Sequence, residues 1–263
     1  MKGREPYPDE ELRRRIMDFI MAAGQTLLEN GAEVFRVEQT MEIMARSFHL
    51  REFHVYVLTN GIFASAGTAE ISEVRNVPVR TTHLGRVAAV NALSREIAQT
   101  HMSLGEAEYK LAAAQRIPFP KNWVQLVSGM CGAFSFAMIF GGTLRAGLAA
   151  ALAGFLASGY LLLCDRHALP GGFKKISCAA LITLVCLLSC HVLGTPASHA
   201  IIGALMILTP GIAFTMGIRD FVHGDYLSGT IRMIDALLVA ASIAIGTGLV
   251  LSLSAFFTGV VAA

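Results

Sequence analysis

The residues best placed to do chemistry lie in one apolar stretch, residues 205–242, which contains the sequence Thr209-Pro210-Gly211. Proline has no amide hydrogen and disfavours helical geometry in the residue before it, so a helix through this stretch is expected to break here. In a bilayer, the carbonyl groups freed by such a break must bind neighbours, water or a ligand. The backbone at the break and the hydroxyls of Thr209 and Thr215 are therefore candidates to bind a polar solute. A plain proline kink is the alternative.

Asp235 is the second candidate, because an ionisable residue inside a membrane span is functional by default. It follows an expected turn at Gly224 by about ten residues, or roughly 15 Å of helix. An equal distance back along the preceding helix reaches Ala213, one turn from Pro210. A carboxylate there could carry a proton or hold the ammonium group of a substrate. The alternative role of Asp235 is an ion pair with Arg232.

Other charged residues surround the expected turn. Gly224 is expected to end one helix, and Asp225 to cap the next. Arg219 and Asp220 precede this turn and Arg232 follows it. We expect Arg219, Asp220, Asp225 and Arg232 at the cytoplasmic rim, as headgroup anchors and a local ion pair or as parts of a gate.

Charge is distributed unevenly along the chain. Residues 1–122 contain fifteen Lys/Arg and fifteen Asp/Glu, whereas the remaining residues contain six and four. This distribution predicts a mainly α protein: a small cytoplasmic α+β domain, residues 1–120, followed by a five-helix transmembrane bundle, residues 121–263. The N-terminal segment has no apolar signal core, so no cleaved signal peptide is expected.

Apolar residues at helical spacing predict four helices in the first domain, over residues 9–28, 33–48, 83–101 and from Ser103 to the segment IPFPK. Residues 53–67 are β-branched and aromatic around Asn60-Gly61, which predicts a β-hairpin. Glu33, Arg36 and Glu38 fall on a charged helix face, which is usually solvated. The domain has no phosphate loop, no catalytic triad spacing and no zinc ligand set. We therefore expect no catalytic residue, metal, cofactor or nucleic acid partner.

Five apolar runs predict five spans, since each approaches the length that crosses a bilayer. They cover residues 122–141, 145–163, 175–194, 199–218 and 230–257. With the first domain in the cytoplasm, basic residues cluster at the cytoplasmic ends of the spans and only Arg145 lies outside. The sequence thus predicts a multi-pass protein of the bacterial inner membrane, with its N-terminus in the cytoplasm and its C-terminus outside.

Small residues recur along the spans, as at Gly147, Ala151, Gly154 and Ser158. This spacing lets helices approach closely, so the spans are expected to form one packed unit. An odd number of spans means that a similar second half fused after this one would be inverted. Inverted halves with a site at their interface are a common transporter plan.

Several motifs in the same order resemble the signature of the threonine/serine exporter family. They are LLENGAEVFRVEQTMEIMAR, VLTNGIFASAG, VAAVNALSREI, FAMIFGG and LTPGIAFTMGIRDFVHGDYLSGTIRMIDALL. Glu33, Arg36, Glu38, Thr59 and Asn60 belong to these motifs. The resemblance leaves open whether they gate, regulate, or serve folding and docking, and we favour the last.

Within that family the chain resembles the larger subunit of the split form. The resemblance implies a separate small membrane subunit, a hetero- or homo-oligomer, and proton-coupled export of threonine, serine or small organic acids such as dicarboxylates. The soluble domain of the family has been likened to hydrolases, but this sequence has no nucleophile–base spacing that supports such a role, so we expect no enzymatic activity. The alternatives are a membrane scaffold or sensor whose soluble domain is the active part, and an intramembrane aspartyl hydrolase that uses Asp225 and Asp235. The hydrolase would need two facing aspartates on different spans.

Overall fold

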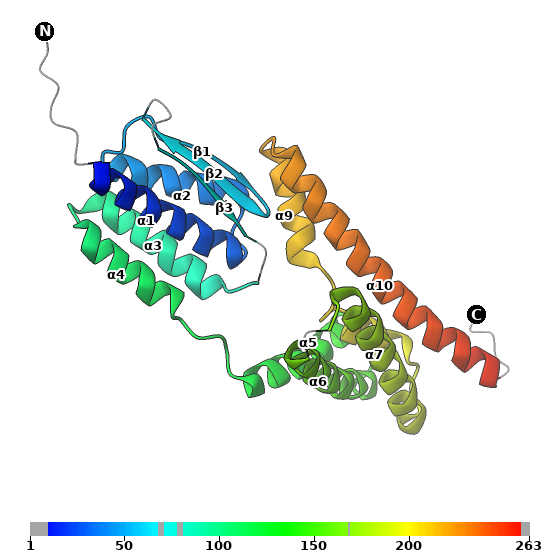
Figure 1. Ribbon diagram of the computed structural model, residues 1–263. Coiled ribbons are helices and arrows are strands. Elements are labelled where there is room, and N and C mark those ends of the chain that lie inside the picture. Colours follow the sequence, from blue (N-terminus) through cyan, green and yellow to red (C-terminus); the bar gives the residue numbers. More distant parts are fainter. Residues whose placement is uncertain (1–9, 68–70, 78–80, 168, 259–263) are drawn as a thin grey trace, which may run out of the picture. The chain divides into compact units, whose positions relative to one another are not determined.

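The computed structural model describes residues 10–67, 71–77, 81–167 and 169–258 (Figure 1). The chain forms two compact units. The first contains Met1–Phe119 and Thr215–Arg232, and the second contains Pro120–Phe214 and Met233–Ala263. The predicted class is confirmed: the chain is mainly helical, with one small sheet followed by long apolar helices.

The four predicted helices of the first unit are all present. They are α1 (Glu10–Glu29), α2 (Val34–Ser47), α3 (Leu84–Gln99) and α4 (Leu104–Gln115). Helix α4 begins as expected, because the Ser103 hydroxyl accepts a hydrogen bond from the Glu106 amide at 3.3 Å. Helices α1 and α2 pack so closely that a methyl group at Gly24 would overlap the Met41 side chain.

The sheet is antiparallel, with the order β1 (His54–Leu58), β2 (Gly61–Ala66) and β3 (Ile71–Asn76). The predicted hairpin is present, but its two-residue loop is Thr59-Asn60, because Leu58 pairs with Gly61. Gly61 therefore opens β2 and does not occupy the turn. Ile62 and Ala64 are buried while Phe63 is exposed, so one face of β2 contributes to the core of this unit.

Within the described residues, four helices are long and apolar enough to cross a bilayer: α5 (Asn122–Ile139), α6 (Leu144–Arg166), α7 (Gly171–Leu193) and α10 (Tyr226–Thr258). The predicted span over residues 199–218 is divided between α8 (Ser198–Leu205) and α9 (Gly211–Val222). At 1.5 Å per residue these are about 12 and 18 Å long, so neither crosses a bilayer alone.

Small residues bring the apolar helices together. A methyl group at Gly154 of α6 would lie 2.5 Å from the Gly129 carbonyl of α5, which is closer than real contacts allow. A methyl group at Gly246 of α10 would lie closer still to the Ile176 carbonyl of α7. Close approach of helices through small residues is typical of membrane helix packing.

Candidate functional site

Between α8 and α9 the helical hydrogen-bond pattern fails. The amides of Ile207, Leu208 and Thr209 donate to carbonyls three residues back, and the Gly211 amide donates to the Thr209 carbonyl at 2.9 Å. Pro210 then opens α9, since its carbonyl accepts from the Phe214 amide at 3.0 Å. The break therefore lies next to Pro210, because proline has no amide hydrogen to donate within a helix.

The break leaves polar backbone groups open. Among the described residues, no hydrogen bond reaches the carbonyl oxygens of Ile207 and Leu208. The exposed Thr209 hydroxyl donates to the Leu205 carbonyl at 3.3 Å, which leaves its oxygen able to accept. These two carbonyls and the hydroxyl come from three consecutive residues, and each can accept a hydrogen bond from an ammonium or hydroxyl group. The sequence marked Thr209 and Pro210, but not Ile207 and Leu208, whose side chains are apolar.

Helices α9 and α10 are joined by a tight turn. Gly224 has a left-handed φ of 88°, its amide donates to Phe221, and the Asp225 amide donates to the Asp220 carbonyl at 2.9 Å. This pair of bonds is a Schellman motif, which favours glycine at this position. Asp225 precedes α10, and its carbonyl accepts from the Gly229 amide.

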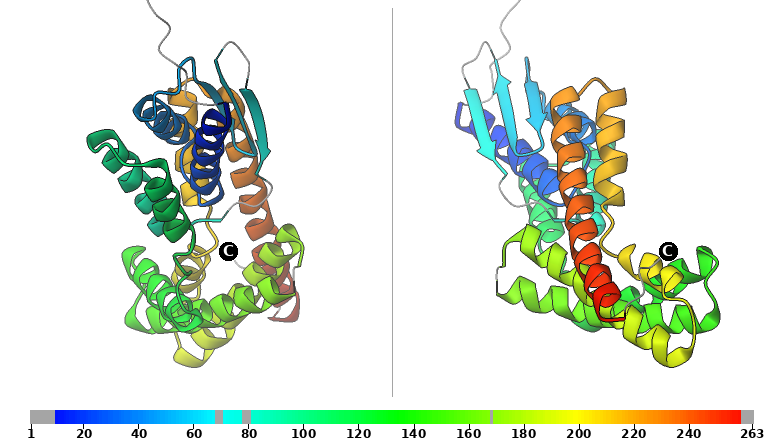
Figure 2. Two further views of the ribbon diagram at one scale, coloured as in Figure 1. Left: turned by 60° about the vertical axis from the view of Figure 1, so that its left-hand side comes forward. Right: turned by 90° about the vertical axis from the view of Figure 1, so that its right-hand side faces the viewer.

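The two helices then run side by side (Figures 1 and 2). A methyl group at Gly229 would meet the Gly217 carbonyl at 3.0 Å, so the helices are in close contact at this level. Asp235 lies six residues beyond Gly229, or about 9 Å along α10. An equal distance back along α9 from Gly217 reaches Gly211, in the first turn of α9. Both Asp235 and Gly211 make polar contacts, and the Asp235 side chain is exposed.

Asp220 and Arg232 form a buried pair across the helices. Nε of Arg232 lies 3.0 Å from Oδ2 of Asp220, in ion-pair contact but without the alignment of a hydrogen bond. The two side chains are 2% and 11% exposed. Both residues were expected at the cytoplasmic rim, as headgroup anchors and a local ion pair or as parts of a gate. That role stays a prediction, and the structure buries the two side chains against each other. Burial raises the pKa of Asp220, and the Arg232 charge opposes that rise only in part.

The junction of α1 and α2 contacts this turn. Nη1 of Arg219 lies 2.5 Å from Oε1 of Glu33, the residue that precedes α2. Arg232 also donates to the Ala32 carbonyl at 3.3 Å. The ring of Phe35 stacks on that of His223, with centroids 4.8 Å apart. We call the seven residues that meet here the junction cluster: Ala32, Glu33, Phe35, Arg219, Asp220, His223 and Arg232.

The other family-motif residues of the first unit support its fold. Oε1 of Glu38 accepts from the Val57 amide at 2.8 Å and so ties α2 to β1. Burial raises the pKa of Glu38, while this hydrogen bond opposes the rise. Arg36 is exposed and donates to Gln39 at 2.9 Å. Thr59 is buried and Asn60 accepts from the Val77 amide, so both belong to the hairpin.

Two sets of residues that the sequence treats separately are thus brought together. Glu33 of the first unit and Arg219, Asp220 and Arg232 of the turn share the junction cluster. Phe35 and His223 were not predicted to belong to a site. Their pairing carries no local signal, because the two rings are far apart in the sequence.

The aspartyl hydrolase alternative gains no geometric support. Asp225 directly precedes α10 and Asp235 lies on that same helix, so about 15 Å of helix separates them. Within the described part of the chain, no group of three His, Cys, Asp or Glu side chains could hold a metal ion.

Comparison with known proteins gives a consistent result. The family model described as "Putative threonine/serine exporter" matches residues 18–254. A curated relative, "Probable threonine/serine exporter" of Mycobacterium tuberculosis, is 23% identical over 243 residues. That match covers 90% of this chain and 46% of the relative, so the chain spans about half the length of the curated protein it matches. No solved structure matches. The chain is a membrane protein that belongs to the threonine/serine exporter family.

Proposed function

We propose that the chain is a transporter subunit that exports small polar amino acids, threonine or serine, or small organic acids across the bacterial inner membrane. The observation that carries this proposal is the break between α8 and α9. It presents two open carbonyls and the Thr209 hydroxyl beside long apolar helices. Polar backbone inside a membrane protein is stable only where it is buried or lines a solute path.

In this proposal Asp235 completes the solute path. The helical register puts it level with the first turn of α9, where amide groups and the helix dipole favour a negative charge. A carboxylate in such a place can bind an ammonium group, or take up and release a proton during the transport cycle. Export driven by the proton gradient then requires Asp235 to change its protonation state.

The proposed roles at the turn follow from the contacts. Arg219, Asp220, Asp225 and Arg232 form the cytoplasmic gate, and Glu33 docks the soluble domain on it. The buried Asp220–Arg232 pair fixes the turn, whereas the more exposed Arg219–Glu33 pair can open and close at low cost. The soluble domain therefore acts as a regulator of access to the break.

A second membrane unit completes the transporter. The curated relative is about twice as long as its match to this chain, which supports a path built from two units. We propose that a separate small subunit of the same family supplies the second unit. The exposed polar positions Thr209 and Asp235 would then face that subunit and not lipid.

Efflux of labelled threonine, serine and succinate tests the proposal, with the chain and its partner reconstituted in liposomes. The wild-type complex is expected to move threonine or serine, and Asp235→Asn to abolish coupling to the proton gradient. Asp165→Asn is the matched control, because Asp165 is exposed and pairs with Lys174 at a helix end. A complex that is intact but moves none of these solutes would favour the scaffold or sensor. Unchanged coupling in Asp235→Asn would remove this residue from the mechanism.

A further inference from the structure

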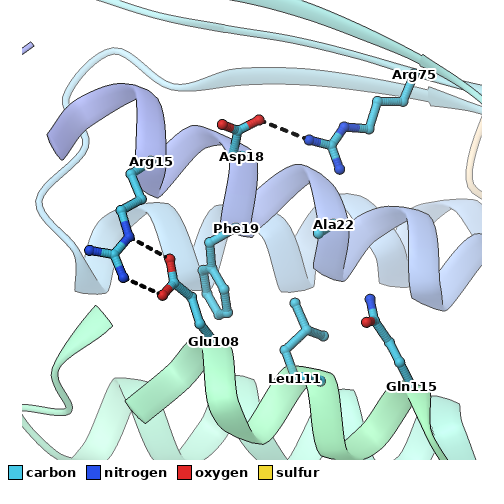
Figure 3. A pocket seen from close by; sticks show the side chains of 9 residues that line it. Arg15, Asp18, Phe19, Ala22, Arg75, Glu108, Leu111 and Gln115 are labelled. Atoms are coloured by element: carbon cyan, nitrogen blue, oxygen red, sulfur yellow. Dashed lines mark hydrogen bonds and ion pairs between the residues drawn. The ribbon is translucent and has the colours of Figure 1, made fainter. Parts of the chain in front are cut away.

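A cavity in the soluble domain lies outside all the contacts described above. It has a volume of about 400 Å³ and opens between α1, β3 and α4 (Figure 3). We call it the α1–α4 pocket. Its lining is formed by Arg15, Asp18, Phe19, Ala22, Arg75, Glu108, Leu111, Ala112 and Gln115.

Charge in the pocket is balanced and ordered. Arg15 binds Glu108 through two parallel hydrogen bonds of 2.8 and 2.5 Å, which tie α1 to α4. Arg75 of β3 donates through Nη2 to Asp18 at 3.0 Å and through Nε to Glu73 at 2.7 Å. The lining therefore holds two guanidinium and two carboxylate groups, and its formal charge is zero. A ligand that carries both signs of charge matches such a lining better than a dianion does.

Several polar atoms of the pocket can form hydrogen bonds beyond those they make within the protein. Among the described residues, no protein acceptor faces Nη1 of Arg75, although that side chain is only 23% exposed. Asp18 uses one carboxylate oxygen for Arg75, and the other has no protein donor in the described chain. Gln115 donates to the Thr26 hydroxyl at 2.9 Å, which leaves its carbonyl oxygen as an acceptor. A donor edge and an acceptor thus lie on adjacent side chains, Arg75 and Asp18.

The space itself results from small side chains. Phe19 and Leu111 are buried and form an apolar floor, while Ala22 of α1 and Ala112 of α4 leave room between the helices. A leucine at Ala112 would add three carbon atoms to the pocket lining. The neighbouring Ala113 is exposed and does not line the pocket.

We propose that the α1–α4 pocket is a binding site for a small zwitterionic α-amino acid. The carboxylate of the ligand binds the free edge of Arg75, and its ammonium group, on the adjacent carbon, binds Asp18. A short polar side chain lies over the Phe19–Leu111 floor within reach of Gln115. The choice of threonine or serine as ligand rests on the proposed function. In that setting the soluble domain senses the solute that the membrane domain exports.

Hydrogen–deuterium exchange of the full chain in lipid nanodiscs tests this site. Threonine, serine and succinate are the probes, each added up to millimolar concentration. Threonine or serine is expected to slow exchange over residues 15–22, 71–76 and 104–115, and succinate is not. Ala112→Leu is expected to abolish this protection, whereas the matched Ala113→Leu keeps it. Arg75→Gln is expected to weaken binding at least about tenfold, because it removes a charged hydrogen-bond donor to the ligand carboxylate. Arg14→Gln, a variant outside the pocket, is expected to leave the binding affinity unchanged.

Three results would overturn the proposal: no protection by either amino acid, equal protection by succinate, or protection that survives Ala112→Leu. The efflux assay run on the same protein separates the two proposals. Efflux of threonine or serine without slower exchange at the pocket contradicts only the proposed binding site. Protection that persists in Asp235→Asn, a residue outside the pocket, supports a site distinct from the transport path. Protection without any efflux contradicts only the proposed transport function.

Discussion

The Asp220 carboxylate lies 3.0 Å from the Arg232 guanidinium, and this pair joins two antiparallel helices away from water. Arg232 also reaches the Ala32 carbonyl, so one side chain links α10 to α9 and to the start of α2. A buried charge without its partner is costly, so the pair fixes the geometry of the turn.

Removal of one member of this pair should destabilise the first unit strongly. Asp220→Asn is expected to cost about 3–5 kcal/mol, because it removes the carboxylate charge that lies 3.0 Å from the buried Arg232 guanidinium. The control is Glu42→Gln, which breaks an exposed pair with Arg46 and should cost about 1 kcal/mol or less. Denaturant unfolding of the detergent-solubilised protein measures both. If both variants lost the same free energy of unfolding, the buried pair would contribute no more to stability than the exposed pair, which would contradict the prediction.

Glu38 gives the first unit a defined pH dependence. Its pKa is raised in the folded state, so folding favours the protonated form. Stability from this group is then greatest below its unfolded pKa and falls as the pH rises through the folded pKa. Glu38→Gln keeps an acceptor for the Val57 amide and carries no charge, so it should be more stable than wild type at pH 7. That advantage should vanish near pH 4.

Unfolding curves at a series of pH values measure this difference. The control is Glu11→Gln, an exposed position in the first turn of α1. Its difference from wild type should vary little over the same range. A constant advantage of Glu38→Gln at all pH values would assign the effect to packing and not to charge.

His83 should fix the segment between α4 and α5. Its Nδ1 accepts from the Arg86 amide at 3.2 Å, so the ring proton of the neutral form is on Nε2, which donates to the Pro118 carbonyl at 3.1 Å. His83→Ala removes both bonds and should cost about 1 kcal/mol as a lost helix cap. Amide exchange at residues 84–87 and 117–119 should quicken. The control His101→Ala, at an exposed loop residue, should leave these amides unchanged; equal effects would refute the assignment.

Gly154 should tolerate no side chain. Gly154→Ala places a methyl group 2.5 Å from the Gly129 carbonyl and should destabilise the α5–α6 pair by about 1–3 kcal/mol. At Gly159 of the same helix the nearest atom would be 3.6 Å away, so Gly159→Ala should be neutral or stabilising by about 1 kcal/mol. Thermal stability in detergent measures the contrast. The reverse order would mean that α5 and α6 are not held by this contact.

Pro210→Ala should impair export without unfolding the protein. The new amide allows α8 and α9 to join, which would occupy the carbonyls that are open at the break. Loss of contacts worth about 1.4 kcal/mol lowers affinity tenfold, so efflux at low solute concentration should fall by at least about that factor. Pro196→Ala, in the α7–α8 connection, is the control. Normal efflux from Pro210→Ala would mean that the break is only a kink.

The helices and the hairpin were predictable, since their signals are local. Apolar periodicity marks α1–α4, and long apolar runs mark α5–α7. The Ser103 cap marks the start of α4, and Pro210 marks the start of α9. The hairpin loop was displaced by one residue because pairing of Leu58 with Gly61, and not the glycine signal, decides its register. The sequence shows which residues favour a turn. It does not show which of two neighbouring strand registers pairs better, because that depends on contacts between the strands.

The sequence alone determined the division into a charged α+β domain and apolar helices, and the position of the helix break, because composition and proline geometry act on neighbouring residues. Only the tertiary structure decided which charges meet. Glu33 and Arg219 are 186 residues apart, and Asp220 is buried although its neighbours in the sequence suggest a membrane rim. Burial and ion pairing depend on which elements pack together. The same holds for the α1–α4 pocket, whose charges come from three separate elements.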